Sequence, residues 1–226
     1  MNLGELTALI QEDLVDERLT SQQIQGAILA SIEFYARQEF YFNIPIYNFP
    51  IVPEKEIYTV ADNPYIKDTF SIKLVIADLQ STGRGLIDLT PYNIQNDYPI
   101  RPVVSPTLPR FYTYNNFTLR LTPPSSYPGT LTVVAAVKFA PLASESDTNM
   151  WLQEASEMIR ASAKRRLCLN VFHDREMAEG NAILEREQRE YLERETTKRL
   201  PETLMSIPYD LLVLSGPGMG YDIRYG

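Results

Sequence analysis

Residues 20–43 read TSQQIQGAILASIEFYARQEFYFN, an apolar helical repeat that runs into a cluster of aromatic side chains. Thr20 and Gln23 have the spacing of a capping box, in which the hydroxyl binds the third backbone amide and the Gln side chain returns to the cap. The apolar residues that follow recur at steps of four, four and three, so they share one helix face. We therefore predict a helix from residue 20 to about Phe40, before Pro45 forbids its continuation. Its buried face is Ile24, Ile28, Ile32 and Tyr35.

Helical spacing also marks residues 3–15 and the C-terminal half of the chain. Any of residues 147–149 is a competent cap for a helix over 148–171. Asp174 is predicted to cap a longer helix over 174–199, which Pro201 should end because proline lacks an amide hydrogen. Glu and Arg alternate along most of this helix, which is typical of a solvated, salt-bridged face. One side differs and holds Met177, Asn181, Leu184, Gln188 and Tyr191.

The middle of the chain has the alternation and the turn residues of β-structure. Residues 41–53 have no charged side chain but contain three prolines, which favours an extended or edge segment over a central strand. A tight hairpin turn is predicted at Asn115 and Asn116, because Asn tolerates left-handed backbone geometry. Long irregular loops are expected over 78–109. The strand candidates are 55–60, 71–77, 110–114, 117–121 and 130–139.

These patterns predict an α+β fold, in which a helical bundle carries an inserted β domain and an extended C-terminal tail. The bundle is expected to consist of the N-terminal helix and the two long C-terminal helices. The expected domains are residues 1–44 with 145–200 for the bundle, 45–144 for the β-rich insertion and 201–226 for the tail.

Composition points to a soluble protein without enzymatic chemistry. The chain has 226 residues, a net charge of −8 and a single cysteine and histidine, Cys168 and His173. Catalysis by a Ser or Cys nucleophile usually needs a histidine beside it, and one Cys with one His does not make an ordinary zinc site. No phosphate-binding loop is present. We therefore expect no catalytic residue, no metal and no cofactor. The chain start lacks the features of a signal peptide, and no apolar run approaches the ~20 residues of a membrane span.

Two segments have the composition of interaction surfaces. From Tyr98 to Ser144 there is no acidic residue, so the basic side chains there are expected either to face an acidic partner or to sit on exposed strand positions. The tail over 202–226 is too apolar for a typical disordered segment, and it is expected to leave its own subunit and dock on a neighbouring subunit or on the portal. The alternative is that the tail folds back on its own β domain. The basic candidates are Arg101, Arg110, Arg120 and Lys138. The docking candidates are Tyr209, Leu211, Leu212, Val213, Leu214 and Tyr221.

Three aromatic-rich motifs occur in a fixed order along the chain. FYFN at 40–43 follows the N-terminal helix, a tyrosine-rich hairpin ends in prolines at 111–124, and NMWL at 149–152 opens a helix before the long charged one. Over residues 18–200 this arrangement resembles the adaptor, or head-to-tail connector, proteins of tailed bacteriophages. The tail beyond Leu200 carries no motif of that family.

The resemblance implies a structural virion protein that is made in the host cytoplasm and located at the head–tail junction. Adaptors of this kind form a ring, of twelve copies in the family, beneath the portal, where they extend the DNA channel and provide the surface for tail assembly. The implied partners are other copies of the chain, the portal protein and tail or nozzle proteins, with no membrane. Double-stranded DNA would pass without tight binding, because an acidic wall repels it. The channel-facing candidates are Glu185, Glu187, Arg189 and Glu193.

Two other functions are compatible with the sequence. One is a head-completion or tail-terminator protein of a long-tailed phage, which would occupy a similar place in the virion. The other is a virion-associated cell-wall hydrolase that uses helix carboxylates. A pair of carboxylates facing a groove would favour the hydrolase, whereas carboxylates facing solvent or a channel would not.

Overall fold

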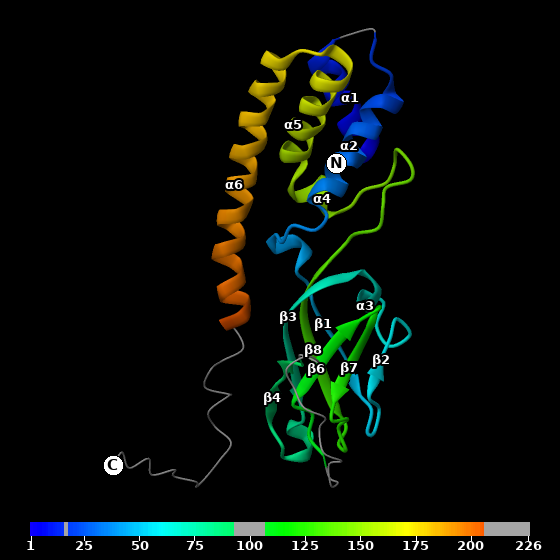
Figure 1. The fold of residues 1–226 in the computed structure, drawn as a ribbon, viewed down its shortest axis with the longest axis vertical. Coiled ribbons are helices and arrows are strands. Elements are labelled where there is room, and N and C mark those ends of the chain that lie inside the picture. Colours follow the sequence, from blue (N-terminus) through cyan, green and yellow to red (C-terminus); the bar gives the residue numbers. More distant parts are fainter. Residues whose placement is uncertain (16–17, 93–106, 206–226) are drawn as a thin grey trace, which may run out of the picture. The chain divides into compact units, whose positions relative to one another are not determined.

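The computed structural model describes residues 1–15, 18–92 and 107–205, and of residues 200–205 it describes the backbone only. Within these residues the chain is α+β, with two four-stranded sheets (Figure 1). The chain divides into two compact units, one mainly helical and one mainly β. The helical unit contains Met1–Pro45, Asp68–Ser71 and Ala136–Arg199, and the β unit contains Ile46–Lys67 and Ile72–Ala135.

The helical unit begins with two capped helices, α1 (Leu3–Leu14) and α2 (Ser21–Tyr35). The predicted capping box at the start of α2 is confirmed, since the Thr20 hydroxyl accepts from the Gln23 amide at 3.3 Å and the Gln23 side chain accepts from the Thr20 amide at 2.9 Å. A second capping box, between Asn2 and Glu5, opens α1. The predicted end of α2 is too late, because the helix stops at Tyr35 and a short 3-10 turn, Tyr41–Asn43, follows.

The C-terminal half is more broken than predicted. In place of one helix over 148–171 the chain forms α4 (Met150–Glu154), α5 (Ser156–Leu167) and a π-helical turn (Cys168–Phe172). The break falls at Ala155, where φ is −125° and ψ is 21°. The predicted cap of the first helix is confirmed for α4 by the side chain of Asn149. The predicted cap of the long helix that begins at Arg175 is confirmed by the side chain of Asp174.

The long helix α6 spans Arg175–Met205 and runs back antiparallel to α5 (Figure 1). The prediction that Pro201 ends this helix is wrong. A proline removes one backbone hydrogen bond and can kink a helix, but the helical geometry here continues through it. His173, with φ of 55°, gives the left-handed turn that reverses the chain between the π-helical turn and α6.

The prediction that the helical part is a bundle of the N-terminal helix and two long C-terminal helices is wrong. The closely packed helices are α1, α2 and α5, so the N-terminal contribution is two helices, and the first C-terminal helix is split. Helix α6 buries only Ala178 and Leu192 among its described apolar side chains, because nearly half of its residues are charged. It therefore lies beside the closely packed helices with little apolar contact. Of the expected extended tail, residues 201–205 instead form the end of helix α6, and residues 206–226 lie outside the described residues.

An aromatic cluster fixes the centre of the helical unit. Trp151 is buried and packs edge-on against Phe40 and Phe42, at centroid distances of 5.8 and 5.0 Å. Such edge-to-face pairs add about 0.5–1.5 kcal/mol beyond the burial of their area. The FYFN and NMWL motifs are thus joined in one core.

The β unit holds two sheets around a shared apolar core. One sheet has the strand order β1-β8-β3-β4 and the other the order β2-β7-β6-β5. β1 lies at an edge, as the prolines of residues 41–53 predict, and buries alternate side chains. The strands are β1 (Ile46–Ile51), β2 (Ile57–Tyr58), β3 (Thr69–Asp78), β4 (Leu86–Asp88), β5 (Thr90–Pro91), β6 (Phe111–Asn115), β7 (Thr118–Thr122) and β8 (Gly129–Val137). The short helical elements are α3 (Tyr65–Asp68) and a 3-10 turn at Gln80–Thr82.

The predicted hairpin joins β6 and β7, but its turn lies one residue later than expected. Positive φ values fall at Asn116 and Phe117, at 46° and 57°, rather than at Asn115 and Asn116. Asn115 instead pairs with Thr118 as the last rung of the hairpin. Two consecutive left-handed residues match the twist of antiparallel strands, which is why this turn geometry prevails.

Candidate functional site

Helix α6 carries all four channel-facing candidates, and its inner face is largely polar. The buried positions recur at helical spacing, so they form one stripe. Three of the five side chains in this stripe are polar, and each has a hydrogen-bond partner. The stripe consists of Ala178, Asn181, Glu185, Leu192 and Thr196.

Glu185 is the central anchor of α6. Glu185 is only 5% exposed. The Tyr35 hydroxyl donates a hydrogen bond to its Oε1 at 2.5 Å, and Arg165 Nε lies 2.9 Å from its Oε2. Burial, and then the neighbouring carboxylate, raise the pKa of Tyr35 above its ordinary value, so the hydroxyl stays a donor. The Glu185 carboxylate therefore points into its own subunit and is not available to line a channel.

A second anchor lies nearer the C-terminal end of α6. The Tyr41 amide donates to Thr196 Oγ1 at 3.0 Å, and the Tyr41 hydroxyl donates to Glu154 Oε2 at 2.6 Å. The guanidinium of Arg199 lies 3.9 Å from the centroid of the Tyr41 ring. Burial, followed by the Glu154 carboxylate, raises the pKa of Tyr41 to about 12. The FYFN motif thus binds α6 through its second residue.

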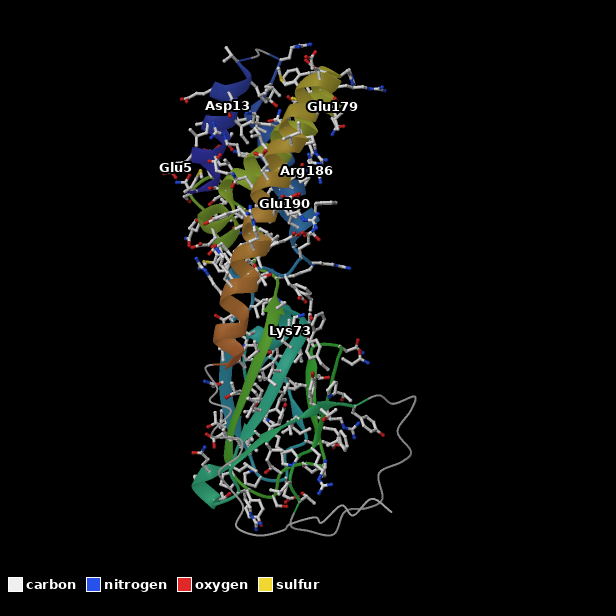
Figure 2. The ribbon with its side chains drawn as sticks, turned by 90° about the vertical axis from the view of Figure 1, so that its left-hand side faces the viewer. Glu5, Asp13, Lys73, Glu179, Arg186 and Glu190 are labelled. Carbon is white, nitrogen blue, oxygen red and sulfur yellow. The ribbon has the colours of Figure 1, made fainter. Side chains whose placement is uncertain are left out.

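The outer face of α6 is charged. Of the channel-facing candidates, Glu187, Arg189 and Glu193 are exposed, and Arg189 Nε donates to Glu193 Oε1 at 2.7 Å. Figure 2 labels further charged side chains along this helix, Glu179, Arg186 and Glu190, all of which are exposed. This face is hydrated and has both signs of charge.

An apolar stripe interrupts the charged surface of α6. Met177, Leu184 and Tyr191 are 47%, 51% and 52% exposed. The sequence pattern grouped these three residues with Asn181 on one side of the helix, but only Asn181 is buried. Periodicity identifies the stripe without showing whether the same subunit covers it.

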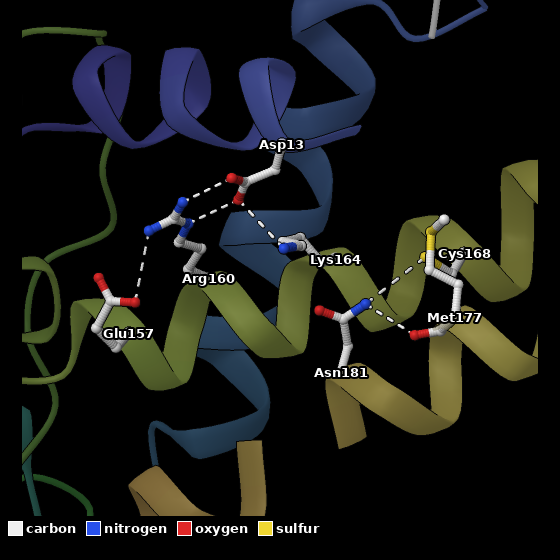
Figure 3. Close-up of polar contacts among 7 residues, drawn as sticks. All are labelled: Asp13, Glu157, Arg160, Lys164, Cys168, Met177 and Asn181. Atoms are coloured by element: carbon white, nitrogen blue, oxygen red, sulfur yellow. Dashed lines mark hydrogen bonds and ion pairs between the residues drawn. The ribbon is translucent and has the colours of Figure 1, made fainter. Parts of the chain in front are cut away.

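A polar cluster joins α1 to α5 (Figure 3). Arg160 donates two hydrogen bonds of 2.8 Å to the Asp13 carboxylate, and Lys164 donates a third at 3.2 Å. Burial alone would raise the pKa of Asp13, but the hydrogen bonds from these cations outweigh it and hold the pKa below 3.8. On its α6 side the cluster borders a groove of about 240 Å³, lined by Glu157, Arg160, Ala161, Lys164, Asn181, Leu184 and Gln188.

The Asp13→Asn variant is expected to lower the free energy of unfolding by about 1–2 kcal/mol at neutral pH, because two partly buried cations lose a carboxylate partner. Since the native pKa is depressed, the difference from wild type is full above the unfolded pKa of about 3.8 and is lost as the pH falls through the native pKa. Urea unfolding at pH 7 and at several lower pH values measures this. Glu12→Gln, at an exposed neighbouring position, is the control. Equal loss in both variants would contradict the assignment.

The three described basic candidates of the middle segment have different surroundings. Arg110 is exposed. Arg120 is paired with Glu56 at 2.6 Å, and Lys138 lies 3.5 Å from a Glu33 oxygen. Arg101 lies outside the described residues, as do all six docking candidates of the tail, Tyr209, Leu211, Leu212, Val213, Leu214 and Tyr221.

Features that would indicate a reaction centre are scarce in the described part of the chain. It holds no group of His, Cys, Asp and Glu side chains suited to a metal ion. Cys168 is buried, with the Asn181 side chain 3.9 Å from its sulfur, and burial raises the pKa of its thiol. Glu190 and Glu193 border a shallow surface groove, but Glu193 is already bonded to Arg189. None of the described helices combines the length and apolar character needed to cross a bilayer.

The chain matches a family model described as SU10 adaptor protein over residues 1–204, which include nearly every residue that the structure describes. No curated protein sequence matches the chain.

Proposed function

The chain belongs to the SU10 adaptor protein family, and we propose that it forms a ring beneath the portal of a phage head, extends the DNA channel and provides the surface on which the tail is built. As a phage adaptor it is a structural protein of the virion that acts with other head and tail proteins. The proposal is carried by the family match, which spans both the helical and the β unit.

The surface of α6 supports the channel part of this proposal. Glu187, Arg189 and Glu193 give the helix a hydrated face, and the whole chain has a net charge of −8. Duplex DNA would slide past such a wall because the acidic side chains repel its phosphates. Glu185 is excluded from this role by its burial.

We also propose that two sets of residues contact partner proteins. The tail residues Tyr209, Leu211, Leu212, Val213, Leu214 and Tyr221 would dock on the portal or on a neighbouring copy, where an added strand can pair its backbone and insert alternate side chains. Arg101 and Arg110 would face acidic partner surfaces. Arg120 and Lys138 would exchange their present partners, Glu56 and Glu33, for such surfaces.

Omission of this chain during phage assembly tests the function. We expect DNA-filled heads without tails, and we expect tails to join these heads when the purified chain is added. Complete, tailed particles in the absence of the chain would contradict the proposal. The hydrolase alternative predicts normal particles that fail to digest peptidoglycan, so the same experiment separates the two functions.

The isolated chain is expected to bind duplex DNA with a Kd weaker than about 1 μM at physiological salt, because its exposed α6 face carries acids among its cations. Fluorescence anisotropy at several salt concentrations measures this. The Glu187→Lys, Glu190→Lys variant is the matched comparison and is expected to bind more tightly, with a steeper salt dependence. Sub-micromolar, salt-sensitive binding by the wild type would count against a non-adhesive channel wall.

A further inference from the structure

The exposed stripe of α6 has the period of a helix–helix contact. Met177, Leu184 and Tyr191 are seven residues apart, so they lie in one line along the helix. All three are about half exposed although each is large and apolar. The stripe continues into the groove between α5 and α6, because Leu184 is also one of the groove's lining residues.

A glycine lies beside this stripe without a structural need in its own subunit. Gly180 is exposed, has an ordinary helical φ, and no atom would lie within 4 Å of a Cβ added to it. Glycine is unfavourable in a helix interior compared with alanine. Between Met177 and Leu184 it leaves a depression on the helix surface.

The outer face of α2 has the same two features. Gly26 is exposed, and a Cβ added to it would likewise have no atom within 4 Å. Leu29, three residues later, is exposed, and so is Ala30. From Ser21 to Ile32 the helix contains no charged residue, and the exposed Gln22 and Glu33 lie on either side of Gly26 and Leu29 on this face.

The two faces are complementary in shape. On α6, Gly180 precedes Leu184 by four residues, which is about 6 Å along the helix axis. On α2, Gly26 precedes Leu29 by three residues, which is about 4.5 Å. When the two helices lie antiparallel, each leucine meets the other helix's glycine. We propose that the α6 stripe of one copy docks on the outer face of α2 of a second copy, with Leu184 over Gly26 and Leu29 over Gly180.

The contact is of the head-to-tail kind. The outer face of α2 lies opposite the buried residues Ile24, Ile28 and Tyr35. The α6 stripe instead borders the groove on α5. Because the two faces differ, each copy can bind one neighbour through α6 and another through α2. Such a contact generates a ring or a filament rather than a closed dimer. This inference rests on the proposed ring and names the helices that would form it.

Glutamine at either glycine tests the contact. Gly26→Gln and Gly180→Gln place a longer side chain in open space and raise helix propensity, so the thermal stability of the monomer should stay equal or rise. We expect both variants to lose at least tenfold in self-assembly on portal rings, measured by light scattering. Glu179→Gln, on another side of α6, is the control and should assemble as wild type does.

Cysteine pairs give a second, direct measurement. Leu29→Cys with Leu184→Cys in one full-length chain should give a ladder of dimers, trimers and higher species on oxidation, whereas each single variant should give none. Buried Cys168 does not enter the ladder. Assembly that survives both Gln variants together with an absent ladder would overturn the contact but leave the ring intact. Dimers from Leu184→Cys alone would overturn the head-to-tail arrangement. A wild-type chain that never assembles, even on portal rings, would contradict both the proposed ring and the proposed contact between α6 and α2.

Discussion

Replacing Glu185 by Ala is expected to lower the free energy of unfolding of the helical unit by about 2–4 kcal/mol. The carboxylate holds α6 through the hydroxyl of Tyr35 and the guanidinium of Arg165. Its loss leaves a buried hydroxyl and a partly buried cation without their partner. Arg165 is one-third exposed and can be rehydrated, so the effect should lie below that of a fully buried pair. Because α6 has little apolar burial to replace this anchor, the helix should loosen first.

Hydrogen exchange along α6, together with urea unfolding, measures this effect. The Glu185→Ala variant should show faster amide exchange over Arg175–Arg199 than the wild type, with α1 and α2 changed less. Glu187→Ala, an exposed change on the same helix, is the matched control and should leave both measurements near wild type. A stability loss under about 0.5 kcal/mol would show that α6 is held by other contacts.

Deleting residues 203–226 is expected to abolish binding to the portal while leaving the stability of the folded units unchanged. The segment contains Leu211, Leu212, Val213 and Leu214, a consecutive apolar run without helical periodicity. Burying each such side chain on a partner is worth about 1.5–3 kcal/mol, although ordering the chain offsets much of this gain. The loss of several anchors should therefore reduce affinity by orders of magnitude.

A variant that keeps the tail length separates side-chain docking from mere chain removal. Leu212→Ser with Leu214→Ser should weaken portal binding strongly, and Glu202→Gln should not. The readout is co-elution with portal rings, with thermal unfolding as the check on the fold. If the truncated chain still joins the portal, or if its fold collapses, the tail does not act as a docking segment.

The parts of the fold that depend on neighbouring residues in the sequence could be predicted. The capping box of Thr20 and Gln23 and the caps Asn149 and Asp174 each depend on atoms within a turn of helix, and each is confirmed. The hairpin was found for the same reason, with its turn misplaced by one residue. Pro201 shows the limit of local signals, since its missing amide makes a helix end favourable but not obligatory.

Features that depend on distant residues could not be predicted. Glu185 has the sequence surroundings of a solvated position, and only its contact with Tyr35, 150 residues away, explains its burial. Leu184 is the reverse case. Helical periodicity predicts the side of the helix on which it lies, but not that this side is exposed to solvent. The sheet order β1-β8-β3-β4 pairs strands far apart in sequence, and alternation within a strand does not name its neighbour.

The mass of the complex between the full-length chain and isolated portal rings tests the ring most directly. Native mass spectrometry should show the portal mass increased by a whole ring of 25.8 kDa subunits, twelve if the family number holds, with few partly filled intermediates. A portal that gains no mass, or that binds single copies without progressing to a ring, would contradict the proposal that this chain forms a ring beneath the portal.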